Sequence, residues 1–230
     1  ELPTLYRYLP AGSPLGCLGT VPLSAGGISA ELSAGFSFFC FTLASPTLTG
    51  IMTTWIHVLF PRGCLERLEG RLFPDTYRFK SGIKTDAVIK RLTRRFEDIW
   101  AQVAKEAQPA AQAMSREKLL SIASIAQKES GDFEDQSKIV RVLLNRLRDG
   151  MRLQSDPSCV YSAKLYKEVP SPKTCKDPEN PYSTYVIRGL PPSPIGNPGR
   201  SAIRAVMRPY VGVNAGKLKY FVAKRDGSRL

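Results

Sequence analysis

The stretch that decides the fold is 118–130, KLLSIASIAQKES, an apolar helical pattern that ends on a carboxylate. Residues spaced three, four and three apart share one face of the predicted helix: Leu119, Ile122, Ala126 and Glu129. Burial disfavours the ionised form of a carboxyl group, and this keeps a Glu available as a proton donor near neutral pH. Glu129 is therefore a candidate general acid. The alternative, a Glu that only ends an amphipathic helix, stays open.

The flanking sequence predicts two more helices. From Thr85, the predicted N-cap, an apolar face recurs at helical spacing through Val88, Leu92, Phe96, Ile99 and Val103. Ser115 is predicted to cap the helix of the opening stretch. Asp132 is predicted to cap the next helix, which runs from about residue 134 to 149 and stops at Gly150. The last two helices should form an antiparallel pair, because only a short loop joins them.

The remaining segments predict loops and a few strands. Aromatic residues between turn residues indicate a loop pinned to the core at 69–79, and residues 151–182 are irregular. The other expected elements are a strand at 182–187, a Pro-rich loop at 189–199, a helix at 201–207 and a strand at 218–223. We interpret the whole as α+β, with the helical pair that carries Glu129 packed against a small sheet and long Pro-rich loops.

Charge divides the chain into two parts. The 230 residues carry a net charge of +13, yet residues 1–65 contain only Glu1, Glu31, Arg7 and Arg62, which cancel. Residues 66–230 therefore hold all the excess, 31 Lys and Arg against 18 Asp and Glu. Such a surface favours a polyanion: nucleic acid, an anionic bilayer or an acidic cell-wall polymer. The sequence has no aromatic and basic motif of a known nucleic-acid reader, so we expect no nucleic-acid partner.

The low-charge segment 1–65 admits three interpretations. Residues 32–60 carry no formal charge, a length sufficient to cross a bilayer. Pro46 and many Ser, Thr and Gly residues dilute its hydrophobicity, and the basic residues that follow it would retain the basic part in the cytoplasm. The segment is thus a membrane span, a disordered segment or a stretch never selected as part of the fold.

Cysteine and histidine content excludes several kinds of site. The single histidine, His57, lies outside the basic part, so Ser-His-Asp and Cys-His catalysis and His-ligated zinc chemistry lack a necessary residue. The five cysteines form no close pair of the CxxC type: Cys17, Cys40, Cys64, Cys159 and Cys175. We expect neither a metal nor a cofactor.

Polar residues of the helix end and the irregular loops could together bind a sugar. The candidates are Glu129, Asn145, Gln154, Asp156, Tyr182, Thr184, Tyr185 and Asn197. Carboxylates and amides supply the dense hydrogen bonding that sugar hydroxyl and acetamido groups require, and aromatic faces suit pyranose rings. Each residue alone is more often a turn or capping residue. The prediction therefore depends on whether the loops converge.

Five segments, in this order and spacing, resemble the YceG-like family of endolytic murein transglycosylases. They are EGRLFPDTYRF at 69–79, IASIAQKES at 122–130, NRLRDGMRLQSDP at 145–157, NPYSTYVIRGLPPSPIGNPG at 180–199 and KYFVAKRDGS at 219–228. The resemblance covers residues 68–228. It implies that 66–230 is a lytic transglycosylase domain, truncated at its C-terminus relative to the family. The family's catalytic Glu is the second acid of a Glu-Lys-Glu segment and matches Glu129, whereas the first acid is Gln127 here.

The resemblance also implies a substrate, a location and partners. Members of the family cut peptidoglycan glycan strands internally, leave 1,6-anhydro-muramic acid ends and help to terminate strand growth beside the peptidoglycan synthesis machinery. One N-terminal helix anchors them in the inner membrane, and the catalytic domain lies on the periplasmic side. The small LysM-like domain that follows this anchor in the family has no counterpart in residues 1–65.

The chemistry of such a lyase requires a single acid. Hydrolysis of a glycoside normally uses two carboxylates, whereas a lytic transglycosylase replaces water with the 6-hydroxyl of the same muramic acid. Asp156 is the residue that would make the protein a hydrolase instead, and the sequence leaves that alternative open. A cell-wall binding module that no longer cuts is the alternative from another class.

Export would also favour a disulfide. Cys159 and Cys175 lie in one loop region, and an oxidising compartment would favour a bond between them. Closing a loop of about 15 residues stabilises the fold by roughly 3 kcal/mol in the chain-entropy account. Two unpaired thiols are the alternative.

Overall fold

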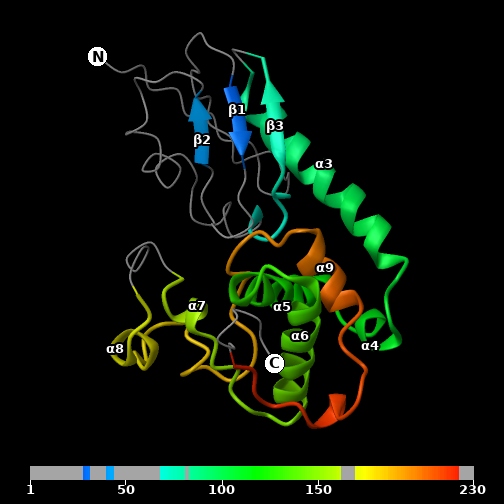
Figure 1. The fold of residues 1–230 in the computed structure, drawn as a ribbon. Helices are drawn as coiled ribbons and strands as arrows, with labels where there is room; N and C mark the ends of the chain where they lie inside the picture. The colour runs from blue at the N-terminus through cyan, green and yellow to red at the C-terminus, as the bar shows by residue number, and fades with distance from the viewer. Residues whose placement is uncertain (1–27, 32–39, 44–67, 81–82, 162–168, 223–230) are drawn as a thin grey trace.

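The computed structural model describes residues 28–31, 40–43, 68–80, 83–161 and 169–222 (Figure 1). Three short strands, β1 (Ile28–Glu31), β2 (Cys40–Leu43) and β3 (Thr76–Phe79), form one antiparallel sheet in the order β2-β1-β3. Ile28 of β1 pairs with Leu43 of β2 and with Phe79 of β3. With the helices that follow, this small sheet gives the predicted α+β fold.

Five helices and helical turns form the part of the structure that carries Glu129. They are α3 (Thr85–Ala104), α4 (Pro109–Gln112), α5 (Arg116–Glu129), α6 (Phe133–Arg148) and α9 (Arg200–Met207). Two four-residue helices, α7 (Asp156–Cys159) and α8 (Pro172–Cys175), lie to one side, and a 3-10 turn, η1 (Ala215–Lys217), follows α9 (Figure 1). The Pro-rich loop 189–199 leads into α9 as predicted.

Two of the three predicted caps are confirmed. The Ser115 side chain accepts a hydrogen bond from the backbone N–H of Lys118, 3.4 Å away. Asp132 accepts from the N–H groups of Glu134 and Asp135, at 2.8 and 3.2 Å. Gly150 has φ +66°, the left-handed conformation expected just after a helix. The third cap is wrong, because α3 begins at Thr85 itself and its N-cap is the preceding residue.

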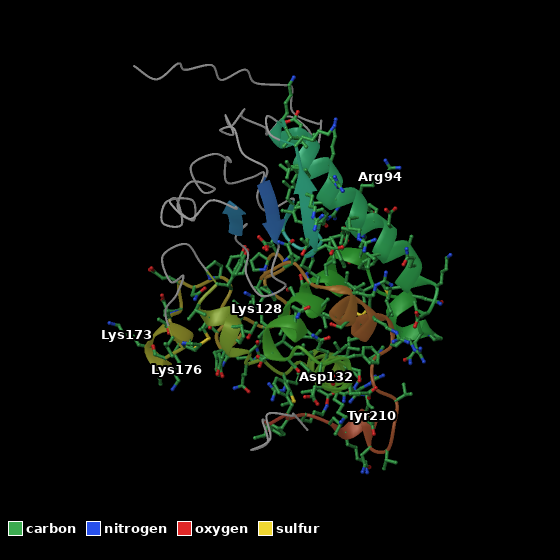
Figure 2. The ribbon with its side chains drawn as sticks, turned by 45° about the horizontal axis from the view of Figure 1, so that its top comes forward. Arg94, Lys128, Asp132, Lys173, Lys176 and Tyr210 are labelled. Atoms are coloured by element: carbon green, nitrogen blue, oxygen red, sulfur yellow. A yellow bond between two sulfur atoms is a disulfide. The ribbon has the colours of Figure 1, made fainter. Side chains whose placement is uncertain are left out.

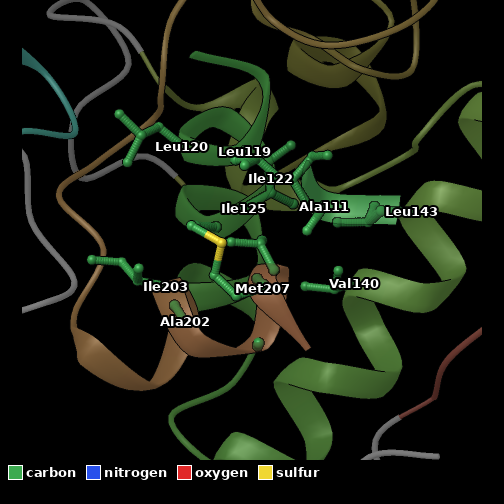
Figure 3. Close-up of a cluster of buried hydrophobic side chains, with 14 of the residues drawn as sticks. Ala111, Leu119, Leu120, Ile122, Ile125, Val140, Leu143, Ala202, Ile203 and Met207 are labelled. Atoms are coloured by element: carbon green, nitrogen blue, oxygen red, sulfur yellow. The ribbon is translucent and has the colours of Figure 1, made fainter. Parts of the chain in front are cut away.

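The helical core is a buried cluster contributed mainly by α3, α5, α6 and α9, with Phe73, Ala111, Leu153 and Ile195 added from other segments. Figure 3 shows Ile122 and Ile125 of α5 in one cluster with Val140 of α6 and Met207 of α9. Each such side chain stabilises the fold by roughly 1.5–3 kcal/mol when it is fully buried. Because the last turn of α5 is built on this cluster, the backbone that carries Glu129 is rigid.

A second, smaller cluster joins the sheet to α3. Tyr77 and Phe79 of β3 pack with Val88, Ile89 and Leu92 in the first half of α3. The second half of the same helix belongs to the helical core. The segment 76–79, predicted as part of a loop, is a strand that pairs with β1, and its alternate side chains are buried against α3.

Both predicted strands near the C-terminus are wrong within the described residues. Residues 182–187 form turns: Ser183 N donates to Asn180 O, and Val186 N donates to Ser183 O. The Asn-Pro-Tyr-Ser sequence supplies turn chemistry that outweighs the strand propensity of the residues after it. Residues 218–222 are irregular, and residue 223 lies outside the described part. Side chains of α6 hydrogen-bond to the carbonyl groups of Leu218 and Lys219, where a strand would need a neighbouring backbone.

The described residues contain no helix both long and apolar enough to cross a membrane. Of the uncharged segment 32–60, only Cys40–Leu43 is described, and it is strand β2. The other residues of that segment, His57 included, lie outside the described part.

Deleting residues 1–60 should leave the helical core folded. The deletion removes β1 and β2 and so exposes an edge of β3. The buried side chains of the helical core, however, all come from residues between Phe73 and Met207. We expect a single cooperative transition when the truncated protein is unfolded by urea and followed by circular dichroism. Loss of cooperativity would show that the N-terminal segment belongs to the core.

Candidate active site

Three consecutive side chains at the end of α5 face three different loops. Gln127 Oε1 accepts a hydrogen bond from the backbone N–H of Gly199, 3.0 Å away, at the N-cap of α9. Lys128, labelled in Figure 2, interacts with Glu69 of the segment before β3. Glu129 faces α7, where it accepts a hydrogen bond from Ser155. The end of α5 is thus the point at which the 69–79, 151–159 and 189–199 segments converge.

Lys128 is adjacent to Glu129 in the sequence, but its side chain interacts with Glu69. Burial lowers the pKa of its ammonium group below the ordinary value, and the negative charge of Glu69 opposes this shift. The interaction with Glu69 links the family segment 69–79 to the QKE segment.

Glu129 is half-buried and oriented by Ser155. The Ser155 hydroxyl group donates to Glu129 Oε1 at 2.7 Å. Ser155 is itself only 1% exposed. Its backbone N–H donates to Thr184 Oγ1 at 2.8 Å, and its carbonyl oxygen accepts from Ser158 Oγ at 2.6 Å. Because both backbone groups of Ser155 are hydrogen-bonded, its hydroxyl is held in place toward the carboxyl group.

Buried hydroxyl groups connect the two loops behind Glu129. Ser158 Oγ and Thr184 Oγ1 lie 2.8 Å apart, and Thr184 N donates to Ser158 Oγ at 3.1 Å. Thr184 is fully buried, so the structure places this predicted sugar-binding residue beneath the site, where it positions Ser155. Sequence reasoning missed Ser155 itself. Its position inside the RLQSDP segment, next to Asp156, was the available signal.

Asp156, which is exposed, and Tyr185, which is half-buried, form a pair beside this network. The Tyr185 hydroxyl group donates to Asp156 Oδ1 at 2.5 Å. Burial, the hydrogen bond to Asp156 and the negative charges of Asp156 and Glu129 raise the pKa of Tyr185 to about 12, against an opposing effect of Arg146. The phenol therefore stays a hydrogen-bond donor throughout the ordinary pH range. Tyr185 therefore lies within electrostatic range of both carboxylates, Asp156 and Glu129.

Gln154 and Tyr182 belong to the two loops that the hydrogen bond from Ser155 N to Thr184 Oγ1 joins. Gln154 has φ 49°, a left-handed conformation that is uncommon for residues other than Gly, Asn and Asp, and its side chain is exposed. Its backbone N–H donates to Thr184 O at 3.1 Å, so the strained turn is held by the 180–187 segment. Tyr182 is half-buried, lies 2.9 Å from Ser193 Oγ through its hydroxyl group and packs edge-on against Tyr161.

The two predicted asparagines lie away from the exposed residues. Asn145 is 2% exposed and donates from Nδ2 to the carbonyl oxygens of Ala215 and Leu218, at 2.7 and 2.8 Å. Asn197 is 5% exposed and accepts from Leu72 N at 3.1 Å. Both amides fix the paths of loops. In this structure they offer little surface to a sugar.

Acidic and cysteine residues do not cluster as metal ligands do. Within the described ranges, no group of three or more His, Cys, Asp or Glu side chains could hold a metal ion.

The predicted pairing of Cys159 with Cys175 is confirmed, since the two residues form a disulfide with their Cα atoms 4.7 Å apart.

Comparison with known proteins assigns the chain to a family. Residues 30–230 match the sequence model of the YceG-like family. An endolytic murein transglycosylase of Bacillus subtilis (strain 168) is 33% identical over 174 residues, which cover 74% of this chain and 45% of the relative. One of Streptococcus pneumoniae (serotype 2, strain D39) is 31% identical over 170 residues, 70% of this chain and 29% of the relative.

The fold agrees with the sequence comparison. A crystal structure of a yceG-like protein from Listeria monocytogenes superposes with a TM-score of 0.62 at 33% identity and covers 71% of this chain and 52% of that one. The matched part of this chain spans less than half the length of the two relatives from Bacillus subtilis and Streptococcus pneumoniae. The family match covers most of the chain and includes every residue of the site described above. The chain therefore belongs to the YceG-like family.

Proposed function

We propose that this protein cleaves the glycan strands of peptidoglycan internally, as a lytic transglycosylase whose general acid and base is Glu129. The observation that carries the proposal is the position of Glu129 at the rigid end of α5, oriented by the buried Ser155 hydroxyl. The names of the relatives, endolytic murein transglycosylases, supply the substrate class. Residues 66–230 form the catalytic domain in this proposal.

The proposed reaction uses Glu129 twice. A carboxylic acid carries its proton on one oxygen, and Oε1 already accepts from Ser155, so the transferable proton is on Oε2. This proton passes to the glycosidic oxygen as the bond from C1 of muramic acid to that oxygen breaks. The 6-hydroxyl oxygen of the same muramic acid then bonds to C1, and its proton returns to the Glu129 carboxylate. No water is consumed, and the products are a 1,6-anhydro end and a free 4-hydroxyl group.

Asp156 and Tyr185 have a separate role in this proposal. The transition state of glycoside cleavage develops positive charge on the sugar ring. Asp156 is exposed and carries a negative charge that Tyr185 holds in place through its hydrogen bond. This fixed charge would stabilise the developing cation, while Gln154 and Tyr182 would bind the flanking sugars.

The proposed location is the outer side of the inner membrane, beside the peptidoglycan synthesis machinery. One property of the relatives and one feature of this chain support the proposed location. The substrate of the relatives is a cell-wall polymer, and the Cys159–Cys175 disulfide is typical of proteins in an oxidising compartment. Internal cleavage of nascent strands at this place would terminate their growth.

Incubation with purified, uncrosslinked glycan strands followed by mass spectrometry tests the proposal. We expect shortened strands whose new ends lack one water relative to the hydrolysed product. Ends that carry the added water would identify a hydrolase. Strands that stay intact but sediment with the protein would identify a binding module.

A further inference from the structure

The Cys159–Cys175 disulfide lies directly behind the group that orients Glu129. Cys159 is the last residue of α7, the helix that begins immediately after Ser155, and Cys175 is the last residue of α8. Cys159 Sγ lies 3.9 Å from the carbonyl oxygen of Ser155. Figure 2 shows α8 at the periphery of the molecule, with Lys173 and Lys176 directed outward. The disulfide thus links the peripheral helix α8 to α7, the helix that begins immediately after Ser155.

Hydrogen bonds extend this connection to the second loop of the site. Asn180 Nδ2 donates to the carbonyl oxygen of Cys159 at 2.7 Å. Ser183 Oγ donates to the carbonyl oxygen of Cys175 at 2.5 Å. Thr184, the next residue, accepts from the backbone N–H of Ser155. Each half of the disulfide is therefore bonded to the 180–184 segment, and that segment holds Ser155.

Few apolar contacts hold this part of the chain. Within 155–160 and 171–184, the nearly inaccessible side chains are the disulfide itself and small polar groups: Ser155, Ser158, Asn180, Ser183 and Thr184. Leu153, just before this segment, and Tyr182 within it pack against the helical core. Helices of four residues, such as α7 and α8, have almost no stability of their own. Hydrophobic burial therefore contributes little after Leu153, and the disulfide is the covalent constraint on the position of α7.

We propose that the Cys159–Cys175 disulfide is a positioning element for the reaction, which holds Ser155 in hydrogen-bond contact with Glu129. The inference rests on the proposed function of the site. Breaking the bond should release α7 and with it the Ser155 hydroxyl, while α5 and the helical core remain folded. The protein would then bind glycan normally but cleave it slowly, so its activity would depend on an oxidising environment.

The first experiment compares the oxidised protein with the protein reduced by dithiothreitol. The dithiol gives two electrons and two protons to the bond, which yields two protein thiols and the cyclic disulfide of the reagent. We expect hydrogen exchange to accelerate in residues 153–160 and 180–185 and to stay slow in α6. Exchange needs no catalytic activity, so this measurement tests the inference even if no glycan is cleaved. Unchanged exchange in both segments, or general loss of protection including α6, would refute a local positioning role.

The second experiment measures kinetics in a double-mutant cycle. Cys159→Ser with Cys175→Ser should lower kcat about tenfold to a hundredfold, the usual effect of a misplaced catalytic group, with KM changed less than about twofold. Dithiothreitol should have no further effect on this variant, which controls for Cys17, Cys40 and Cys64. In the Ser155→Ala background, the same cysteine replacements should cause a smaller loss than in the natural background, because one group that they release, the Ser155 hydroxyl, is already absent; the loss that remains would report the release of Asp156 at the start of α7. Full additivity of the two effects, or an unchanged kcat, would overturn the proposal.

Discussion

Glu129→Gln should remove detectable glycan cleavage and leave the fold intact. The amide oxygen of Gln can still accept the hydrogen bond from Ser155 Oγ, so the side chain should keep its place. The amide cannot give a proton to the leaving oxygen. General acid catalysis contributes a factor of about a hundred to ten thousand, and the variant should lose all of it. Turnover would be measured by mass spectrometry of the strand ends, with circular dichroism and the melting temperature as checks on folding.

Gln127→Glu is the matched control for this experiment. Gln127 is two residues away on the same turn, but its Oε1 accepts from Gly199 N at the N-cap of α9. A Glu there can accept the same hydrogen bond and adds a negative charge near a helix N-terminus, which is favourable by about 0.3–1 kcal/mol. Cleavage should stay within a few-fold of the natural protein. Strong cleavage by a folded Glu129→Gln variant would instead move the general acid to Asp156.

The sequence predicted the helices because their signals are local. The apolar stripe of α5, the cap residues Ser115 and Asp132 and the stop at Gly150 each depend on neighbours within a few residues along the chain. The same pattern predicted that Glu129 and Gln127 face different sides of the helix, and Glu129 contacts Ser155 whereas Gln127 contacts Gly199. Residues two apart on a helix point about 200° away from each other, and this angle separates Gln127 from Glu129.

Strands and buried polar roles depend on partners that are distant in sequence. Thr76–Phe79 is a strand because residues 28–31 pair with it, and no pattern within 69–79 shows this partner. Residue type is the feature that predicts Asn145 and Asn197 as sugar ligands. Their amides bind backbone groups about seventy or more residues away, which residue type cannot reveal. Ser155 was missed for the same reason, since its role appears only when α7 lies against the end of α5.

Asp156→Asn should lower kcat on the order of a hundredfold without changing the chemical nature of the product. Asn keeps the size of the side chain, and its amide oxygen can still accept from the Tyr185 hydroxyl. The variant therefore removes a charge and little else. Electrostatic groups preorganised around a developing charge contribute factors of about a hundred to a thousand. Kinetics on defined glycan oligomers would measure the loss, and circular dichroism would confirm that α7 and its surroundings remain folded.

Tyr185→Phe separates the charge of Asp156 from its orientation. This variant keeps the carboxylate but removes the donor that fixes it, so kcat should fall less, by about tenfold or below. We therefore expect kcat to be highest for the natural protein, lower for Tyr185→Phe and lowest for Asp156→Asn. Equal activity of natural protein and Asp156→Asn would remove Asp156 from the site.

The strand ends that each variant produces show whether Asp156 activates water, as in a hydrolase, or only stabilises positive charge, as in the proposed lyase. A hydrolase would use Asp156 to activate water, and its natural product would carry the added water. Asp156→Asn would then abolish that product, because an amide cannot accept the proton. In the proposed lyase, Asp156 Oδ1 is occupied by Tyr185 and the carboxylate acts only through its charge. Glu129 returns to its acid form by taking the proton of the 6-hydroxyl group, so the slower variant should still yield 1,6-anhydro ends, as the natural protein should.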